Sequence, residues 1–316
     1  MKKGYFKLKI IDLASSAEIS RVGFPLACAI GNFDGVHIGH RQLIEAAADF
    51  CRKSNENIKC AVFTFESNTS GAPFLVSGEE KLQLVAKCGA QIAVTVPFEE
   101  VKSMSCEAFV RDILVCRLDV ARAFCGFNFR FGNKGAGNGA MLAALMQDCG
   151  RSADILPPVT FDGAPVSSTR IRAALAEGNI AAANAMLKRK YGFTSDVVHG
   201  KALGATLGFP TANQLLPAHF AMPRRGVYAS LCKAEGRIFP AVSNIGVRPS
   251  VESGGKENCE TNIIGFSGDL YGRTISVYPM IFLRSEMKFG SVEELAAAVL
   301  RDRETAKKLL AGKYGI

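Results

Sequence analysis

Residues 25–51, "PLACAIGNFDGVHIGHRQLIEAAADFC", contain an apolar run, a glycine-rich turn and a segment with helical spacing. "PLACAI" (25–30) predicts a strand, and one face of the predicted helix carries Leu43, Ala46, Ala47, Phe50 and Cys51. Two of the four histidines, His37 and His40, lie between the two elements. Because they are three residues apart, both face one side of a first helical turn, where free N–H groups attract anions. The stretch predicts a strand-turn-helix unit with an anion site at its turn.

Two other interpretations of the histidines are simpler. One histidine caps the helix while the other packs against it, or the pair binds a metal ion. A metal site needs a third ligand, and the chain has no HExxH motif or remote His/Cys cluster to supply one. A phosphate site therefore remains the favoured interpretation, with capping as its alternative.

The rest of the first half repeats the alternation of strand and helix. Further strands are predicted at 58–65, 91–98 and 119–127, and helices from Ser77 to about Lys87 and over about 105–117. This alternation predicts a doubly wound parallel sheet, in which ligands bind beyond the carboxyl ends of the strands.

The pattern changes near residue 191, where short strand-like runs follow one another between Gly, Pro and Asn turns. Examples are "GVYASLCKA" (226–234) and "RTISVYPMIFL" (273–283). They predict a small antiparallel β-barrel. Ser291 and Glu294 resemble a capping box at the start of a terminal helix. We therefore expect an α/β domain over 1–187 and a barrel domain over 188–316.

The composition narrows the class of protein. The chain has 316 residues, 48% hydrophobic residues and a net charge of +9, without an apolar run long enough to span a membrane. The basic residues are dispersed, which favours a nucleotide over nucleic acid as the anionic partner. The ten cysteines form no CxxC pair, so we expect mostly buried free thiols in a reducing, cytoplasmic environment. We expect no nucleic-acid or membrane partner.

Two further segments lie before the predicted barrel. "VSSTRIRAAL" (166–175) begins a helix with two hydroxyls and two arginines, which is the composition of an anion site, although an ordinary N-cap is the simpler alternative. In "GFNFRFG" (126–132) three phenylalanines alternate with Asn128 and Arg130. The phenylalanines are expected mainly in the core, which leaves Asn128 and Arg130 near the ligand crevice.

These motifs resemble a known family. The HxGH turn and "SSTRIR" are similar to the two ATP motifs of the nucleotidylyltransferase superfamily. With "GFNFRFG" between them, they resemble the N-terminal half of the bacterial bifunctional riboflavin kinase/FAD synthetase family. The segments "GKALGATLGFPTANQLLP" (200–217), "RRGVYAS" (224–230), "SNIGVRPSV" (243–251), "CETNIIGFSGDLYGR" (259–273) and "FLRSEMKF" (282–289) resemble its flavokinase module. The resemblance covers nearly the whole chain.

The resemblance implies two reactions that use ATP as co-substrate. Riboflavin would be phosphorylated to FMN, and FMN would then be adenylylated to FAD with release of pyrophosphate. It implies catalytic roles for His37, His40 and Glu260. For the adenylyltransferase it implies ATP-binding residues Gly31, Phe33, His37, His40, Ser168, Thr169 and Arg172, and FMN-binding residues Asn128 and Arg130. For the kinase it implies ATP-binding residues Gly200, Gly208, Pro210, Thr211 and Asn213, and flavin-binding residues Arg284, Glu286 and Phe289.

The residue chemistry of the kinase motifs is compatible with these roles. Thr211 and Asn213 lie two apart and so on one side of an extended segment, where their neutral oxygens suit Mg²⁺, with Mn²⁺ possible. Glu260 can act as general base toward a hydroxyl, but an exposed strand glutamate is an equally good interpretation from spacing alone. We expect a monomer or a weak homo-oligomer.

Three alternatives remain open. "TFESNTSGAP" (64–73) and the asparagines Asn128 and Asn138 depart from the family pattern, so the chain could be a riboflavin kinase with an impaired adenylyltransferase. It could also be a nucleotidylyltransferase for another phosphorylated substrate, with a barrel that only binds. The third alternative is a non-catalytic flavin- or RNA-binding regulator.

Overall fold

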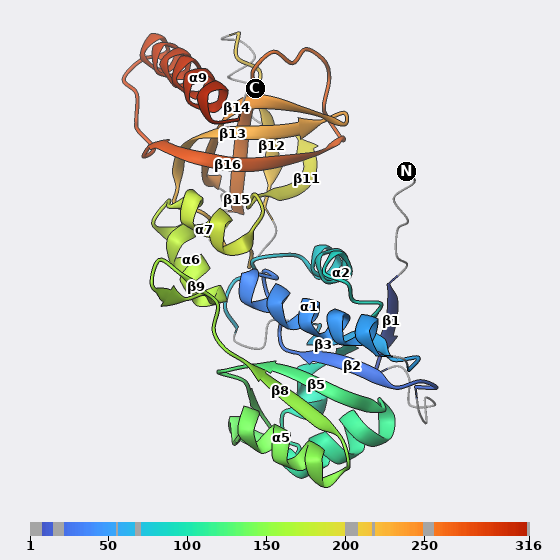
Figure 1. Cartoon of the computed structure of the whole chain (residues 1–316). Coiled ribbons are helices and arrows are strands. Elements are labelled where there is room, and N and C mark those ends of the chain that lie inside the picture. The colour runs from blue at the N-terminus through green and yellow to red at the C-terminus, as the bar shows by residue number, and fades with distance from the viewer. Residues whose placement is uncertain are drawn as a thin grey trace. The chain divides into compact units, whose positions relative to one another are not determined.

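The computed structural model describes residues 8–14, 22–54, 56–66, 71–199, 208–216, 219–248 and 256–314. The chain divides into two compact units, Met1–Ser168 and Thr169–Ile316. Each unit is described by itself (Figure 1). Among the described residues, no helix is both long and apolar enough to cross a membrane.

The first unit contains a six-stranded parallel sheet in the order β1-β4-β3-β2-β5-β8. Its strands are β1 (Lys9–Asp12), β2 (Leu26–Ile30), β3 (Lys59–Phe65), β4 (Ile92–Val96), β5 (Val120–Gly126) and β8 (Ser152–Leu156). From β2 the chain adds β3 on one side and β5 on the other, so the sheet reverses direction at β2. The predicted doubly wound parallel sheet is confirmed, and the HxGH turn follows the strand at this switch point.

Helices cover both faces of this sheet. They are α1 (Ile38–Lys53), α2 (Gly78–Lys87), α3 (Phe98–Val101), α4 (Cys106–Ala108), the π-helix η1 (Phe109–Arg117) and α5 (Gly139–Asp148). The small pairs β6–β7 (Arg130–Phe131 and Gly137–Asn138) and β9–β10 (Thr160–Phe161 and Ala164–Pro165), with a 3-10 turn η2 (Asn133–Gly135), complete the unit. In Figure 1, α1 and α5 lie on opposite sides of the sheet.

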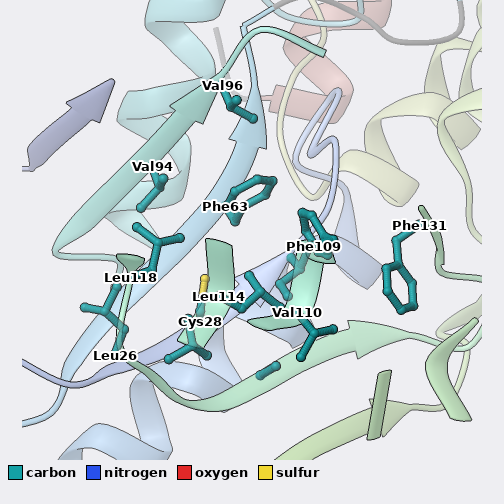
Figure 2. Packing of buried hydrophobic residues seen from close by; sticks show 14 of the residues in the cluster. Leu26, Cys28, Phe63, Val94, Val96, Phe109, Val110, Leu114, Leu118 and Phe131 are labelled. Carbon is teal, nitrogen blue, oxygen red and sulfur yellow. The ribbon is translucent and has the colours of Figure 1, made fainter. Parts of the chain in front are cut away.

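Alternate residues of each strand enter two separate cores. Along β2, Ala27 and Ala29 pack with α1 and α2, whereas Leu26 and Cys28 pack with η1 and α5. Figure 2 shows Phe109, Val110, Leu114 and Leu118 of this second core packed around Cys28 and Phe63. The helix predicted at 105–117 is present, but from Phe109 it is a π-helix, which closes i→i+5 instead of i→i+4 hydrogen bonds.

The second unit contains a closed antiparallel barrel, as predicted, in the order β11-β12-β15-β14-β13-β16. The strands are β11 (Phe193–Val198), β12 (Ala212–Leu215), β13 (Gly226–Ala234), β14 (Arg237–Arg248), β15 (Lys256–Ile263) and β16 (Thr274–Arg284). The terminal helix α9 (Val292–Tyr314) packs on the outer face of β13 and β14. Ser291 accepts from the Glu294 N–H, and the Glu294 carboxylate accepts from the Gly290 N–H, so the predicted cap extends one residue further back than a capping box.

Helices α6 (Ser168–Ala176) and α7 (Ile180–Leu187) belong largely to the second unit. The Arg224 N–H donates to the Leu175 carbonyl at 2.8 Å, and α7 contacts β16. The compact units therefore divide at 168/169, whereas the sequence placed a domain boundary at 187/188.

All ten cysteines are free thiols, and most are buried. Burial raises the pKa of Cys28 and of Cys259 to about 12. These two thiols therefore act as small apolar groups in the cores.

Replacement of Leu114 by alanine tests the packing of the π-helix. Leu114 is fully buried between η1 and the sheet. We expect Leu114→Ala to lower the free energy of unfolding of the first unit by about 3 kcal/mol, the usual cost of such a cavity. Met141→Ala on the exposed face of α5 is the control and should change it by less than about 0.5 kcal/mol. Equal effects in urea unfolding would contradict the packing described here.

Candidate active sites

The HxGH turn has an unusual backbone. Phe33 and Val36 adopt positive φ values of 52° and 41°, and Gly35 lies at 81°. Positive φ is strained for a bulky residue, most of all for a β-branched one, and such strain is concentrated at functional sites. Phe33 is fully buried, so only its backbone could reach a nucleotide, which refines the role that the resemblance implied. Gly31 donates its N–H to the Phe63 carbonyl at 3.1 Å and thereby holds the turn at the sheet edge.

The two histidines lie against each other at the start of α1. Their ring centroids are 3.6 Å apart, with the rings nearly parallel at 18°. His37 is the N-cap, and its Nδ1 accepts the His40 N–H at 3.3 Å. The capping interpretation is therefore also correct. Because Nδ1 accepts, the proton of neutral His37 belongs on Nε2, which gives this ring a donor for an anion.

His40 is held in its neutral form. Burial, with the nearby His37 and Lys81 charges, lowers the pKa of His40 well below 6.5. Its Nδ1 is buried and has no hydrogen-bond partner among the described residues. A bound phosphate would supply the opposite charge that favours the imidazolium, so the charge of His40 can respond to a ligand.

Asp34 and Lys81 support this turn, and the sequence analysis did not identify either. The Asp34 carboxylate accepts the Leu75 N–H at 2.9 Å. Lys81, which is 8% exposed, donates from Nζ to the Phe65 carbonyl at 2.6 Å. Burial lowers the pKa of Lys81 from 10.5 to about 8, against the opposing effect of Asp34. Lys81 thus places a buried cation beside the turn, but as one of several charged residues on α2 it gave no sequence signal.

Ser168 links the second motif to the first. Its hydroxyl donates to the Asp34 carbonyl at 2.9 Å, so this last residue of the first unit is bonded directly to the HxGH turn. On α6, Thr169 is exposed and Arg172 is half-buried. Ser168 therefore acts as a bridge between the motifs as well as a candidate phosphate ligand.

The "GFNFRFG" segment differs in part from expectation. A turn at Phe127 and Asn128 ends β5, and Phe127 is 49% exposed, so its predicted core position is wrong. Phe129 and Phe131 stack at 5.6 Å and form the aromatic face alone. Asn128 follows the carboxyl end of β5, the strand beside β2, and is exposed, as is Arg130. Asn128 therefore lies at the carboxyl-end edge of the sheet, where ligands bind in doubly wound folds, and Arg130 lies two residues further on in β6.

Asn138 and the segment "TFESNTSGAP" (64–73) depart from the family pattern, and the structure describes Asn138 and part of the segment. Asn138 accepts the Met141 N–H at 3.0 Å and so caps α5. Residues 67–70 lie outside the described residues, as do Gly200 and the segment 201–207.

In the barrel, three polar residues form one row across three strands. Glu260 of β15 pairs in register with Asn213 of β12 on one side and Asn244 of β14 on the other. Partners in register project from the same face of a sheet. Thr211 precedes β12, so it lies near this row.

A cavity of about 190 Å³ lies over this face of the barrel. Its walls come from the sheet, from the segment after β16 and from α9. The lining includes Thr211, Asn244, Glu260, Asn262, Arg284, Glu286, Met287, Phe289, Leu295, Val299 and Asp302. The structure therefore gathers Thr211, Glu260 and all three predicted flavin-binding residues around one cavity.

A second cavity, of about 140 Å³, also borders Thr211. Its other walls include Pro210 and the segment Phe266–Tyr271. Tyr271 stacks on His199 with ring centroids 3.9 Å apart, which provides an aromatic surface beside this cavity. Thr211 thus borders both cavities, so ligands bound in the two would approach each other at this residue.

The donors near Thr211 suit a hard cation. The Asn213 amide nitrogen donates to the Thr211 carbonyl at 3.3 Å, and Glu260 adds a carboxylate on the neighbouring strand. Mg²⁺ is bound by few protein oxygens together with waters and phosphates, and this set fits that description. The described residues contain no cluster of three or more His, Cys, Asp or Glu side chains that could hold a metal ion.

The two units define a class of protein. One unit carries an HxGH nucleotidylyltransferase-type sheet, and the other carries a barrel with a two-cavity site. The family model described as "FAD synthetase" matches residues 24–170, and that described as "riboflavin kinase" matches 187–310. The chain belongs to the bifunctional riboflavin kinase/FMN adenylyltransferase family.

Relatives of that description cover most of the chain. The bifunctional riboflavin kinase/FMN adenylyltransferase of Escherichia coli (strain K12) is 37% identical over 290 residues, which are 88% of this chain and 91% of the relative. That of Bacillus subtilis (strain 168) is 31% identical over 291 residues, 88% of this chain and 90% of the relative. A crystal structure described as a macrolide-efflux protein from Streptococcus pneumoniae has a TM-score of 0.85 and 26% identity, covering 95% of this chain and 99% of that one.

Replacement of Lys81 by methionine tests whether the buried lysine has a lowered pKa, through the pH dependence of the free energy of unfolding. The unfolded chain protonates this lysine near 10.5 and the folded protein only near 8, so between these values the unfolded state binds more protons. Stability due to this group therefore rises with pH in that window. From pH 8 to 10 the free energy of unfolding of wild type should rise by about 2 kcal/mol relative to Lys81→Met.

Urea unfolding of both proteins at pH 8, 9 and 10 measures this difference. Lys87→Met, in the last turn of the same helix, serves as the control and should remain parallel to wild type. If the wild-type and Lys81→Met curves are also parallel, the lysine is not held in the unfavourable environment described.

Proposed function

We propose that this chain phosphorylates riboflavin to FMN in the barrel and adenylylates FMN to FAD at the HxGH site, using ATP in both reactions. The single observation that carries the kinase half is the cavity that joins Glu260 and Thr211 to Arg284, Glu286 and Phe289. We assign the adenylyltransferase to 1–187 and the kinase to 188–316. The family segments support a kinase beginning near 188, because one match ends at 170 and the other begins at 187. We place the enzyme in the cytoplasm.

For the kinase, Glu260 is the general base that accepts the proton of the riboflavin 5′-hydroxyl as it attacks the γ-phosphate. Asn258 donates to Glu260 Oε1 at 3.3 Å, which orients the carboxylate. Thr211 and Asn213 would hold Mg²⁺, which neutralises charge on the ATP phosphates when bound. Gly200, Gly208 and Pro210 are the other nucleotide-binding residues, and Arg284, Glu286 and Phe289 bind the flavin.

For the adenylyltransferase, an FMN phosphate oxygen attacks the ATP α-phosphorus and pyrophosphate leaves. His37 and His40 donate hydrogen bonds to the phosphates and stabilise the charge that develops there. Ser168, Thr169 and Arg172 bind the triphosphate, and Asn128 and Arg130 bind the FMN phosphate. The backbone of Gly31 and Phe33 shapes the nucleotide site. No covalent enzyme intermediate is needed.

Two complementary variants test the pair of assignments. Wild type supplied with riboflavin, ATP and Mg²⁺ should give FMN first and FAD second in a chromatographic time course. Glu260→Gln should reduce FMN formation by about 100-fold or more, the usual contribution of a general base, yet still convert supplied FMN to FAD. His37→Ala/His40→Ala should do the reverse, because only the adenylyltransferase loses its donors.

Matched controls separate these effects from general damage. Glu257→Gln changes another carboxylate of β15, and Glu45→Ala changes an exposed residue of α1, and both should retain both activities. Loss of both products in either site variant would contradict two independent sites. Wild type that yields FMN alone is a kinase with an impaired adenylyltransferase, and wild type that binds flavin without turnover is a regulator.

A further inference from the structure

One turn of α9 contacts segments on both sides of the kinase site. Asp302 Oδ2 accepts from Arg284 Nε at 3.1 Å and from Nη2 at 2.8 Å, and Oδ1 accepts from Nε at 3.3 Å. The next residue, Arg303, donates from Nη1 to the Asn262 Oδ1 at 3.0 Å. Two adjacent side chains of α9 therefore anchor two different strands of the barrel.

Asn262 transmits the Arg303 contact to the nucleotide side. It is 4% exposed, and its Nδ2 donates to the Pro210 carbonyl at 2.9 Å. Pro210 immediately precedes Thr211, the residue shared by the two cavities. The Arg303 guanidinium also lies 5.9 Å from the ring centroid of Phe209. Arg303 thus reaches the Phe209–Thr211 segment by two routes, one through a buried amide and one through an aromatic ring.

The Asp302 contact serves the opposite side of the cavity. Arg284 ends β16 and begins the segment that carries Glu286 and Phe289. Its guanidinium lies 5.8 Å from the Phe289 ring centroid. The Arg284 and Asp302 side chains are only 24% and 13% exposed, so this ion pair is largely shielded from water. A shielded, doubly hydrogen-bonded pair fixes side-chain geometry more firmly than a surface pair does.

We propose that Arg303 is a positioning residue for the nucleotide side of the kinase site, which acts through Asn262 on the Pro210–Thr211 backbone. Its neighbour Asp302 positions the flavin side through Arg284. Because the two residues are adjacent on one rigid helix, α9 sets the distance between the two substrates. This inference rests on the proposed kinase function of the barrel.

Separate kinetic effects on the two substrates test the proposal. Arg303→Met removes the guanidinium but keeps an unbranched chain, and we expect the KM for ATP to rise about tenfold with the KM for riboflavin within about twofold. Asp302→Asn should raise mainly the KM for riboflavin. Arg303→Lys, which keeps one cationic donor, should recover part of the ATP affinity. Arg301→Met, at an exposed position of the same helix, is the matched control and should retain wild-type KM values.

The variant Asn262→Asp tests the hydrogen bond from Asn262 to the Pro210 carbonyl. Aspartate keeps an acceptor for Arg303 but loses the N–H that donates to the Pro210 carbonyl, so it should reproduce the rise in the KM for ATP. If Arg303→Met does not fold, Arg303→Lys and Asn262→Asp must still show that selective rise. Equal changes in both KM values, or no change in folded variants, would overturn the proposal.

Conversion of supplied FMN to FAD reports on the first unit and should be unchanged in every α9 variant. Failure of the proposed kinase function can be told apart from failure of the positioning role. In the first case wild type itself would form no FMN, and no KM values could be measured. Wild-type FMN formation combined with unselective variants would overturn the positioning role alone.

Discussion

The buried carboxylate of Asp34 maintains the geometry on which the first active site depends. The turn after β2 contains positive φ values at two bulky residues, a conformation that the chain would not hold unaided. Asp34 bonds through its side chain to the Leu75 backbone and through its carbonyl to the Ser168 hydroxyl. The same carboxylate favours the charged form of Lys81. One residue thus joins the strained turn, the start of α6 and a buried cation.

In the barrel, the positions of the site residues depend on the register of the strands and not on a strained backbone. Asn213, Glu260 and Asn244 occupy one row because β12, β15 and β14 pair without a shift at these positions. A slip of one residue in β15 would exchange Glu260 for an inward-facing neighbour such as Cys259 or Thr261, both fully buried. Buried bonds such as that between Ser243 and Thr261, at 3.0 Å, oppose such a slip. The position of the Glu260 carboxylate is therefore a consequence of packing inside the barrel.

Periodicity was sufficient for most of the fold because each strand and helix had one regular apolar face. It placed β2, β3, α2 and the barrel strands β13 and β16 within a residue or two. It failed where local geometry changes within an element: at the turn that exposes Phe127, and in η1, where the buried residues keep ordinary helical spacing and so gave no sign of the π-helical hydrogen bonds. The contacts of Lys81, Asn262 and Arg303 could not be predicted from the sequence, because each joins residues far apart in the chain. Nothing in the local sequence distinguishes a buried lysine or arginine from an exposed one.

In the two proposed reactions, the negative charge of ATP would be balanced by different groups. At the HxGH turn, a helix N-terminus and two stacked imidazoles provide donors, and the neutral state of His40 avoids repulsion with His37 and Lys81 until a phosphate arrives. In the barrel, neutral oxygens and one carboxylate suit a hard cation, so positive charge enters with the nucleotide. A carboxylate base beside phosphates is tolerable only with that charge present. The reaction proposed for the HxGH site needs no such base, since a phosphate oxygen of FMN is already ionised and has no proton to lose before it attacks.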